Sequence, residues 1–416
     1  MIRAIFNSIL TCRYKLQLIS LVLVALTLPF SLKLNNIAIG LLVLGWLLSG
    51  NYLFKLKKAF TNKLFLLFAG VYALQFVGLF YTSNMGEGLR LVETKAALAI
   101  LPLILASSER LTQKHIYVII CAFIISCVLL TTYASFAIIK DFKAFDTAAG
   151  LTEFIDVAID LHHAYSGMYL VFAVAASFYL AFAGNLKKPY RVLLVVTGLF
   201  LFAFLVIVAA RTAVFTSFLL FFVFLVYSLL VGKRKKYLIA AAFASIALVV
   251  IVLSLPNTKA KIEEFKTLKG VHSPMTPRLI KWKCCFKVLK GQSAWGWGVG
   301  TGDVQNHLQM CYSEEKFWGD RYLLNAHNEF LEEMVRHGLP GVLLFVFSLF
   351  YPLWLSVKSD KKLYAIFLIV FIMSSLTEST LSRQKGVVFY ALFNSLFAFS
   401  YLRGKLELTG QGEDEN

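Results

Sequence analysis

Charged residues are scarce in this sequence: Asp, Glu, Lys and Arg together make up 15% of the 416 residues, whereas 59% are hydrophobic. Soluble domains carry about 25% charged residues. The shortage therefore excludes an ordinary soluble protein for most of the chain. A separate soluble catalytic domain is excluded as well, because the only long stretch without an apolar run is 256–338.

Nucleotide-binding motifs are also missing. The run Gly296–Gly302 alternates glycine with other residues, and such a run either brings backbone amides close to a phosphate or allows a tight turn. No Gly-Lys-Ser/Thr follows it, which excludes a P-loop, and its spacing does not fit a dinucleotide fingerprint. Both interpretations of the glycine run, a phosphate cradle and tight packing, stay open.

The sequence has instead a series of apolar runs of roughly 17 to 25 residues, each long enough to cross a hydrocarbon core of about 30 Å. Twelve runs are present, near residues 16–32, 37–54, 64–81, 89–106, 116–139, 163–184, 192–210, 212–231, 237–255, 339–357, 363–381 and 386–402. The sequence therefore predicts an all-α polytopic membrane protein with about twelve transmembrane helices. One large helical loop is expected between the ninth helix and the tenth.

The basic residues follow these runs in a regular way. If the N-terminus is cytoplasmic, the segments on the same side hold 21 Lys and Arg residues, and the short segments on the other side hold eight. The positive-inside rule then predicts that both chain termini are cytoplasmic. Because the positive charge follows topology, the net charge of +18 does not indicate a nucleic-acid partner.

These runs divide the chain into four parts. They are helices one to nine (1–255), the large outer loop (256–338), helices ten to twelve (339–402) and a cytoplasmic tail (403–416). Most residues that suggest a function lie in the outer loop.

Two helices are predicted within the loop. Thr276-Pro277 is typical of a helix start, and the residues that follow alternate a basic face with an apolar one, as in a helix that rests on a membrane surface. The second helix is predicted over 326–337, with Asn325 as its N-cap and Gly338 at its end.

Three side chains in this setting suggest chemistry. Arg211 interrupts an apolar stretch and marks a hairpin tip, Arg278 lies in the first turn of one predicted helix, and His327 lies near the positive end of the other. Guanidinium groups bind diphosphate through bidentate, charge-assisted bonds. A helix N-terminus disfavours imidazolium, and a neutral imidazole can accept a proton. Structural alternatives stay open for all three: an interfacial arginine, a solvated arginine and a packed histidine.

A shorter outer segment, 140–162, is rich in acidic residues and ends in His162-His163 at a helix start. Its acidic residues are Asp141, Asp146, Glu153, Asp156 and Asp160. We interpret it either as a lid or as a solvated linker.

Six cysteines do not form a disulfide scaffold, because three lie in or beside the predicted spans. In the outer loop, either Cys284 or Cys285 could bridge to Cys311. His307 and Cys311 are four residues apart, as zinc ligands can be, but the further ligands have no recognised spacing. We therefore expect no metal.

Four motifs follow one another along the chain. They are Ala210-Arg211-Thr212-Ala213; Arg278-Leu-Ile-Lys-Trp282; Gly296-Trp-Gly-Val-Gly300; and Ala326-His327-Asn328-Glu329-Phe330-Leu331-Glu332, followed by Gly338 and Gly341. In order and spacing, the chain resembles the O-antigen ligase and O-antigen polymerase superfamily of bacterial membrane glycosyltransferases.

The resemblance implies an inverting, metal-independent enzyme without a cofactor. It would transfer a glycan from undecaprenyl diphosphate to a hydroxyl of an acceptor such as lipid A-core, in the inner membrane and at its periplasmic face. The resemblance further implies that Arg211 and Arg278 bind the diphosphate and that His327 acts on the acceptor. Lys95, Arg90 and Glu332 are expected to assist in substrate binding.

Three classes of function remain open. The first is a ligase, which the late position of the loop and its His-Asn motif favour. The second is a polymerase of the same superfamily or a protein O-oligosaccharyltransferase. The third is a polysaccharide transporter or flippase, which would place ionisable residues near the bilayer midplane. Here the charges gather at helix ends and in one outer loop, so transport is disfavoured.

Overall fold

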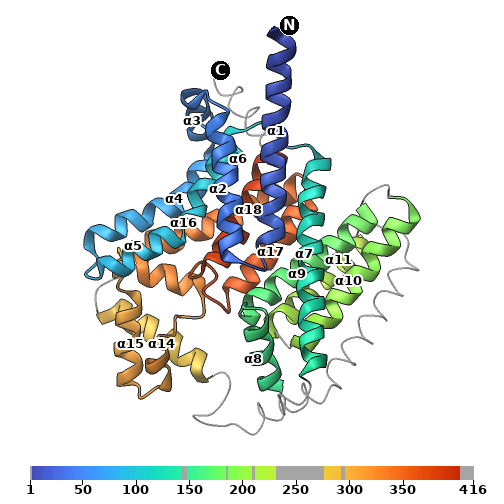
Figure 1. The fold of residues 1–416 in the computed structure, drawn as a ribbon. Coiled ribbons are helices and arrows are strands. Elements are labelled where there is room, and N and C mark those ends of the chain that lie inside the picture. The colour runs from blue at the N-terminus through green and yellow to red at the C-terminus, as the bar shows by residue number, and fades with distance from the viewer. Residues whose placement is uncertain are drawn as a thin grey trace.

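The computed structural model describes residues 2–141, 148–183, 186–208, 211–230, 276–291 and 296–402, and every regular element in these ranges is a helix (Figure 1). The predicted all-α class is thus confirmed for the described part of the chain. Predictions that concern residues 237–255, 256–275 or the tail 403–416 lie outside these ranges.

The helices before the outer loop are α1 (Ile2–Thr27), α2 (Leu32–Leu48), α3 (Tyr52–Phe60), α4 (Lys63–Val77), η1 (Gly78–Tyr81), α5 (Met85–Thr94), α6 (Ala97–Ser107), α7 (Gln113–Lys140), α8 (Ala148–Ala158), α9 (His163–Ala183), α10 (Lys188–Val208) and α11 (Arg211–Leu230). The later helices are α14 (Thr276–Gly291), α15 (Val304–Glu314), η3 (Trp318–Tyr322), α16 (Glu329–Lys358), α17 (Lys362–Ser375), α18 (Gln384–Phe397) and η4 (Ala398–Leu402).

Six helices in the described residues are long and apolar enough to cross a membrane, and all six coincide with predicted spans. They are Lys63–Tyr81, Gln113–Lys140, His163–Phe182, Lys188–Ile207, Glu329–Lys358 and Gln384–Leu402. A seventh span is possible if α2 and α3, which bend by 114° at their junction, count as one. The protein is therefore a multi-pass membrane protein by composition and helix length.

The predicted span 89–106 differs in the structure, where the chain breaks into α5 and the short apolar α6. The break lies at Lys95, whose side chain is fully buried and forms an ion pair with Glu333 of α16 at 2.5 Å. A helix of α6's 11 residues spans only about 16 Å, roughly half of a hydrocarbon core. Hydropathy alone merged the two helices, because it could not weigh a tertiary ion pair.

The helices pack around α18, and the apolar stretch that α18 forms with η4 is entirely buried inside the protein. Aromatic rings from four helices meet there: Phe123 of α7, Phe172 of α9, Phe367 of α17, and Phe389 and Phe393 of α18. Their centroids lie 4.9–5.9 Å apart in these pairs, a normal range for aromatic contacts. A helix that is apolar on all sides belongs in such a central position.

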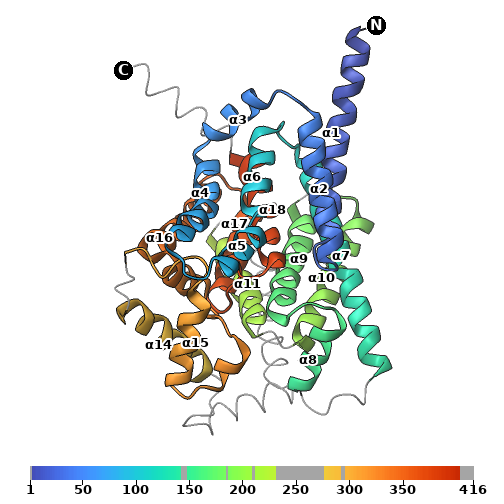
Figure 2. The same cartoon turned by 60° about the vertical axis from the view of Figure 1, so that its left-hand side comes forward.

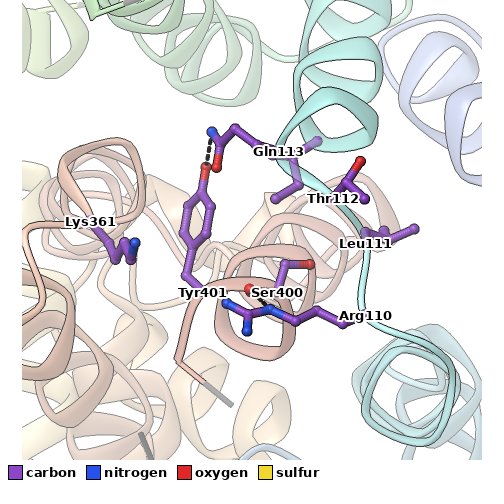
Figure 3. A pocket seen from close by; sticks show the side chains of 8 residues that line it. Arg110, Leu111, Thr112, Gln113, Lys361, Ser400 and Tyr401 are labelled. Atoms are coloured by element: carbon purple, nitrogen blue, oxygen red, sulfur yellow. Dashed lines mark hydrogen bonds between the residues drawn. The ribbon is translucent and has the colours of Figure 1, made fainter. Parts of the chain in front are cut away.

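Segments predicted to face the cytoplasm meet at one end of this bundle. Arg110 donates from Nε to the Ser400 carbonyl at 2.6 Å, and Gln113 donates to the Tyr401 hydroxyl at 3.1 Å. These residues and Lys361 line a cavity of about 300 Å³ (Figure 3). The start of α1 and the helix α3 lie towards the same end (Figure 1).

Segments predicted to be outer meet at the opposite end, where α8, α14 and α15 lie (Figures 1 and 2). Gln384 contacts Asn36, and the Lys385 ammonium donates to the Asp160 carbonyl at 2.5 Å. In these contacts, segments that were predicted to lie on the same side of the membrane touch one another.

The described part of the outer loop forms a small second core. Cys284, Cys285 and Leu289 of α14 are fully buried against Leu308 and Tyr312 of α15. α14 coincides with the predicted amphipathic helix. Two lysines of its basic face, Lys283 and Lys287, pair with Glu315 and Glu314 at the end of α15.

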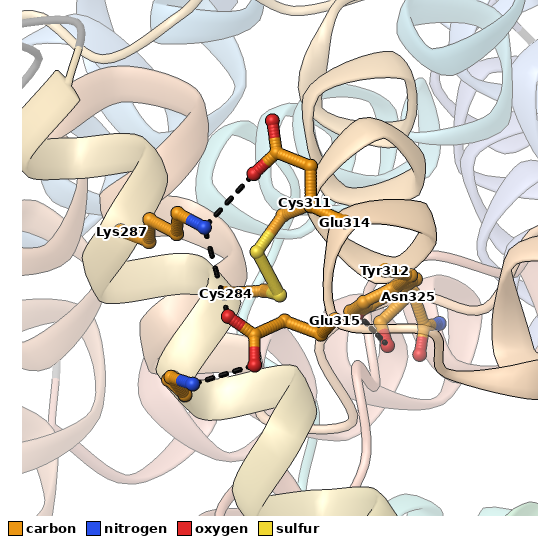
Figure 4. Close-up of a disulfide and its surroundings, with 8 residues drawn as sticks. Cys284, Lys287, Cys311, Tyr312, Glu314, Glu315 and Asn325 are labelled. Carbon is orange, nitrogen blue, oxygen red and sulfur yellow. Dashed lines mark hydrogen bonds and ion pairs between the residues drawn. A yellow bond between two sulfur atoms is a disulfide. The ribbon is translucent and has the colours of Figure 1, made fainter.

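Figure 4 shows this contact between α14 and α15. Lys283 pairs with Glu315 at 2.5 Å, and Lys287 lies 2.8 Å from Glu314. A disulfide joins Cys284 to Cys311, with a Cα–Cα distance of 5.7 Å. Of the two bridges that the sequence left open, the structure contains the one from Cys284.

We expect a thiol count on the denatured protein to rise by two when a reductant is added, because one disulfide releases two thiols. The count is measured by mass-tagging with a maleimide polymer before and after reduction. Cys284→Ser should remove the rise, whereas the neighbouring Cys285→Ser, the matched control, should leave it intact. An equal count with and without reductant would contradict the bridge.

Candidate functional site

His327 precedes α16 instead of lying within it. The helix begins at Glu329, and its N-cap is Asn328, whose side-chain oxygen accepts from the Leu331 amide at 3.1 Å. The prediction of Asn325 as the cap was wrong. Asn325 instead accepts from the His327 amide at 3.1 Å, in a turn where His327 has a φ of 47°.

The His327 imidazole forms a pair with Glu378, in the short connection between α17 and α18. Nδ1 of His327 lies 3.0 Å from a carboxylate oxygen of Glu378. Asn328 donates to the Leu376 carbonyl at 3.1 Å, so two neighbouring residues fix the start of α16 to this connection. A carboxylate on one imidazole nitrogen orients the ring and leaves the other nitrogen to exchange a proton.

Glu378 is strongly acidic in this position. Burial alone would raise its pKa, but the hydrogen bond and charge of His327, helped by His162, outweigh burial and lower the pKa to about 2. The carboxylate is therefore ionised at neutral pH. This differs from the sequence interpretation, which left the His327 imidazole to the helix N-terminus alone.

Cationic groups lie around this pair. Lys281 of α14 is buried; burial lowers its pKa to about 8, while the charge of Glu378 raises it and that of Arg278 lowers it further. Arg278 is half-buried in the first turn of the same helix. Lys281 is thus close enough to Glu378 and to Arg278 for both charges to act on its ammonium group.

Arg211 is the first residue of α11, and its side chain lies outside what the structure describes. Its neighbour Thr212 accepts a hydrogen bond from the Thr377 hydroxyl at 2.9 Å. Because Thr377 directly precedes Glu378, the start of α11 lies beside the connection that carries Glu378.

Glu332 and Lys95 lie in a buried ionic network beneath the site. Glu332 accepts from the Ala326 amide at 3.0 Å and from Arg336 at 2.9 Å. Lys95 is held by Glu333, as described above. Through the Ala326–Glu332 hydrogen bond, this network positions the turn that carries His327. Arg90 lies apart on α5, exposed and paired with Glu87 at 2.5 Å.

The glycine run is used for packing. The amides of Val299 and Gly300 donate to the carbonyls of Val335 and Arg336, at 2.9 and 3.1 Å. Those of Thr301 and Gly302 donate to Gly78 and to the Thr82 hydroxyl. Four amides that a phosphate cradle would need are therefore already engaged. Between the two open interpretations, the structure favours tight packing.

A sequence profile described as O-antigen ligase matches residues 198–346 of this chain. The match covers less than half of the chain, and over that stretch it supports the resemblance to the O-antigen ligase and polymerase superfamily seen in the motifs. A search of curated proteins finds no match.

The matched range includes Arg211, Arg278 and His327, whereas Glu378 lies beyond it. Glu378 was missed because the apolar run 363–381 absorbed it, although an ionisable residue inside a predicted span is itself a functional signal. The disulfide decides one alternative: Cys311 has no free thiolate to offer a metal together with His307.

Gly298→Ala should lower the thermal unfolding midpoint clearly. Gly298 has a φ of +75°, and an added Cβ would lie 2.4 Å from the Arg336 backbone, so about 1–3 kcal/mol of strain is expected. Gly40→Ala is the control, because nothing lies within 4 Å of its added Cβ. Differential scanning fluorimetry in detergent measures both. Equal midpoints for the two variants would contradict the packing described for the glycine run.

Proposed function

We propose that this protein is an O-antigen ligase-like glycosyltransferase. It transfers a glycan from undecaprenyl diphosphate to a hydroxyl of an acceptor, lipid A-core, at the periplasmic face of the bacterial inner membrane. The observation that carries the proposal is the His327–Glu378 pair: its carboxylate acts on the charge of Lys281, and its histidine lies within the matched range.

His327 acts as the general base of the transfer. Glu378 holds Nδ1 in its protonated form, and Nε2 takes the proton of the acceptor hydroxyl. The hydroxyl oxygen then forms a bond to the anomeric carbon of the donor as the bond from that carbon to the diphosphate oxygen breaks. Attack opposite the leaving diphosphate inverts the anomeric centre.

The departing diphosphate gains negative charge, and cationic side chains stabilise it. Arg278 and Lys281 of α14 supply positive charge on one side of the His327–Glu378 pair. The start of α11, where Arg211 lies, contacts the connection that carries Glu378. Prepositioned groups of this kind stabilise the transition state more than the ground state, because the charge develops during the reaction.

Two observations support a periplasmic position. The Cys284–Cys311 disulfide lies in the loop core at the end of the bundle that carries the site, and disulfides persist in oxidising compartments. The segments at the other end carry the excess of basic residues, as cytoplasmic segments do.

Glu378→Gln should lower kcat by about 100-fold or more with little change in KM, because the neutral amide cannot hold His327 in the required protonation state. Glu315→Gln, at the residue that caps the C-terminus of α15, is the matched control and should keep full activity. The assay follows glycan transfer from a purified polyprenyl-diphosphate donor in detergent.

The pH dependence follows from the same pair. The folded pKa of Glu378 lies below its usual 4.5, so its charge stabilises the site fully above about pH 4.5, and this stabilisation is lost as the pH falls towards about 2. Titration of Glu378 should therefore cause no change in the transfer rate between pH 5 and 8.

For the substitution described above, a Glu378→Gln variant with wild-type kcat would remove the residue from the mechanism.

The test of the whole proposal is deletion of the gene, followed by gel analysis of lipopolysaccharide and of polyprenyl-linked glycan. A ligase leaves lipid A without polymer while long chains accumulate on the lipid carrier. Single repeat units on lipid A would overturn the ligase assignment in favour of a polymerase. Two unchanged pools would overturn the glycosyltransferase proposal.

Complementation with variants identifies the residues. Arg211→Ala and Arg278→Ala should each transfer glycan about 100- to 1,000-fold more slowly, the usual effect of removing one electrostatic contact to a developing charge. Arg110→Ala, at the opposite end of the bundle, is the control and should restore wild-type lipopolysaccharide. Equal protein levels are verified by immunoblot.

A further inference from the structure

A cluster of possible metal ligands lies where α8 meets α9, next to the site described above, since His162 is close enough for its charge to act on Glu378. Asp156 projects from α8, His162 lies in the connection, and His163 is the first residue of α9. One ligand atom from each of the three lies within 4.8 Å of the others. The cluster comes from the acidic segment that the sequence left as a lid or a linker.

Two features of the cluster remain unexplained by a simple ion pair. Nδ1 of His163 lies 2.8 Å from one carboxylate oxygen of Asp156, which would satisfy a histidine–aspartate pair. The second oxygen, Oδ1, is buried and has no hydrogen-bond partner among the described residues. A second imidazole, that of His162, also lies against the first, with ring centroids 4.1 Å apart.

We propose that Asp156, His162 and His163 form a Zn²⁺ site that joins α8 to the start of α9. Two imidazoles and one carboxylate are ligands that zinc accepts readily, and three protein ligands leave the fourth tetrahedral position to water. Ligand atoms on a tetrahedral zinc lie roughly 3.4 Å apart, given bond lengths of about 2.1 Å. A pair separated by up to 4.8 Å therefore closes by at most about 1.4 Å, which side-chain rotation provides.

The zinc site braces the connection that carries Glu378. Tyr165, two residues after His163, donates its hydroxyl to the Ser379 carbonyl at 3.1 Å, and it is almost fully buried. Fixing the start of α9 therefore fixes Ser379 and, next to it, Glu378. The role of zinc is structural, and its binding does not depend on the proposed transfer reaction.

The test is zinc binding to the full-length protein in detergent. The protein is purified with a tag that lacks histidine, stripped with EDTA and titrated with Zn²⁺ against a fluorescent chelator of known affinity. We expect one zinc per chain, and a thermal unfolding midpoint that rises when zinc is restored. Asp156→Asn should weaken binding at least tenfold, and a His162→Gln, His163→Gln double variant should abolish it.

His307→Gln in α15 is the matched control, since this histidine lies in a different part of the protein, and it should bind zinc as the wild type does. Substoichiometric binding by the wild type, or equal binding by the double variant, would overturn the site. If the double variant fails to fold, zinc K-edge absorption of the loaded wild type decides. A shell containing two imidazoles supports the site, and a shell without imidazole overturns it. None of these readouts uses glycan transfer.

Discussion

Charged side chains inside a protein are stable only when they are paired, and four paired charged side chains support the candidate site. Lys95 and Glu333 form one pair and Glu332 and Arg336 another, all nearly inaccessible to solvent. Removing one partner of a buried pair typically costs about 3–5 kcal/mol, because the other charge is left uncompensated. The helices α5, α16 and the connection before α18 are therefore held at fixed positions relative to one another.

Several local features follow from this network. Glu332 faces the Ala326 amide, and the Ser379 hydroxyl lies 3.3 Å from the same carboxylate oxygen, so one carboxylate reaches both the turn of His327 and the connection of Glu378. Arg336 donates to the Thr301 carbonyl at 2.6 Å, which brings the glycine run against α16. At Gly338, where φ is 64°, the helix changes direction and the spanning part begins. Besides its contact with Glu378, the position of His327 thus depends on Glu332 and Arg336, which His327 itself does not contact.

The sequence predicts the helical class, six of the spans and three candidate residues, because apolar runs and short motifs are local signals. His327 was found by its motif, but its helix cap was misplaced by three residues: Asn325 and Asn328 are both good caps, and only the tertiary contact with Leu376 selects between them. Glu378 had one local signal, an ionisable residue inside a predicted span, but its pairing with His327 and its charge effect on Lys281 arise only when α14, α16 and the connection after α17 come together.

Lys95 shows the same limit from the other direction. The family resemblance implies that Lys95 assists in substrate binding, and the structure shows that its charge is paired with Glu333, 238 residues away along the chain. Long-range pairing of this kind leaves no trace in hydropathy. The zinc ligands illustrate a middle case, because His162 and His163 are adjacent in sequence but Asp156 joins them only through the fold of α8 onto α9.

The disulfide of the loop core has a neighbour that could undo it. Cys285 directly follows Cys284 and is a free thiol, and exchange of partners with the bridge would require its thiolate. Burial raises the pKa of Cys285 well above its usual range, so the group stays a thiol, which is a poor nucleophile. Once α14 has packed against α15, the bridge is therefore protected from rearrangement by the same packing that it secures, and the pairing formed first is the pairing that persists.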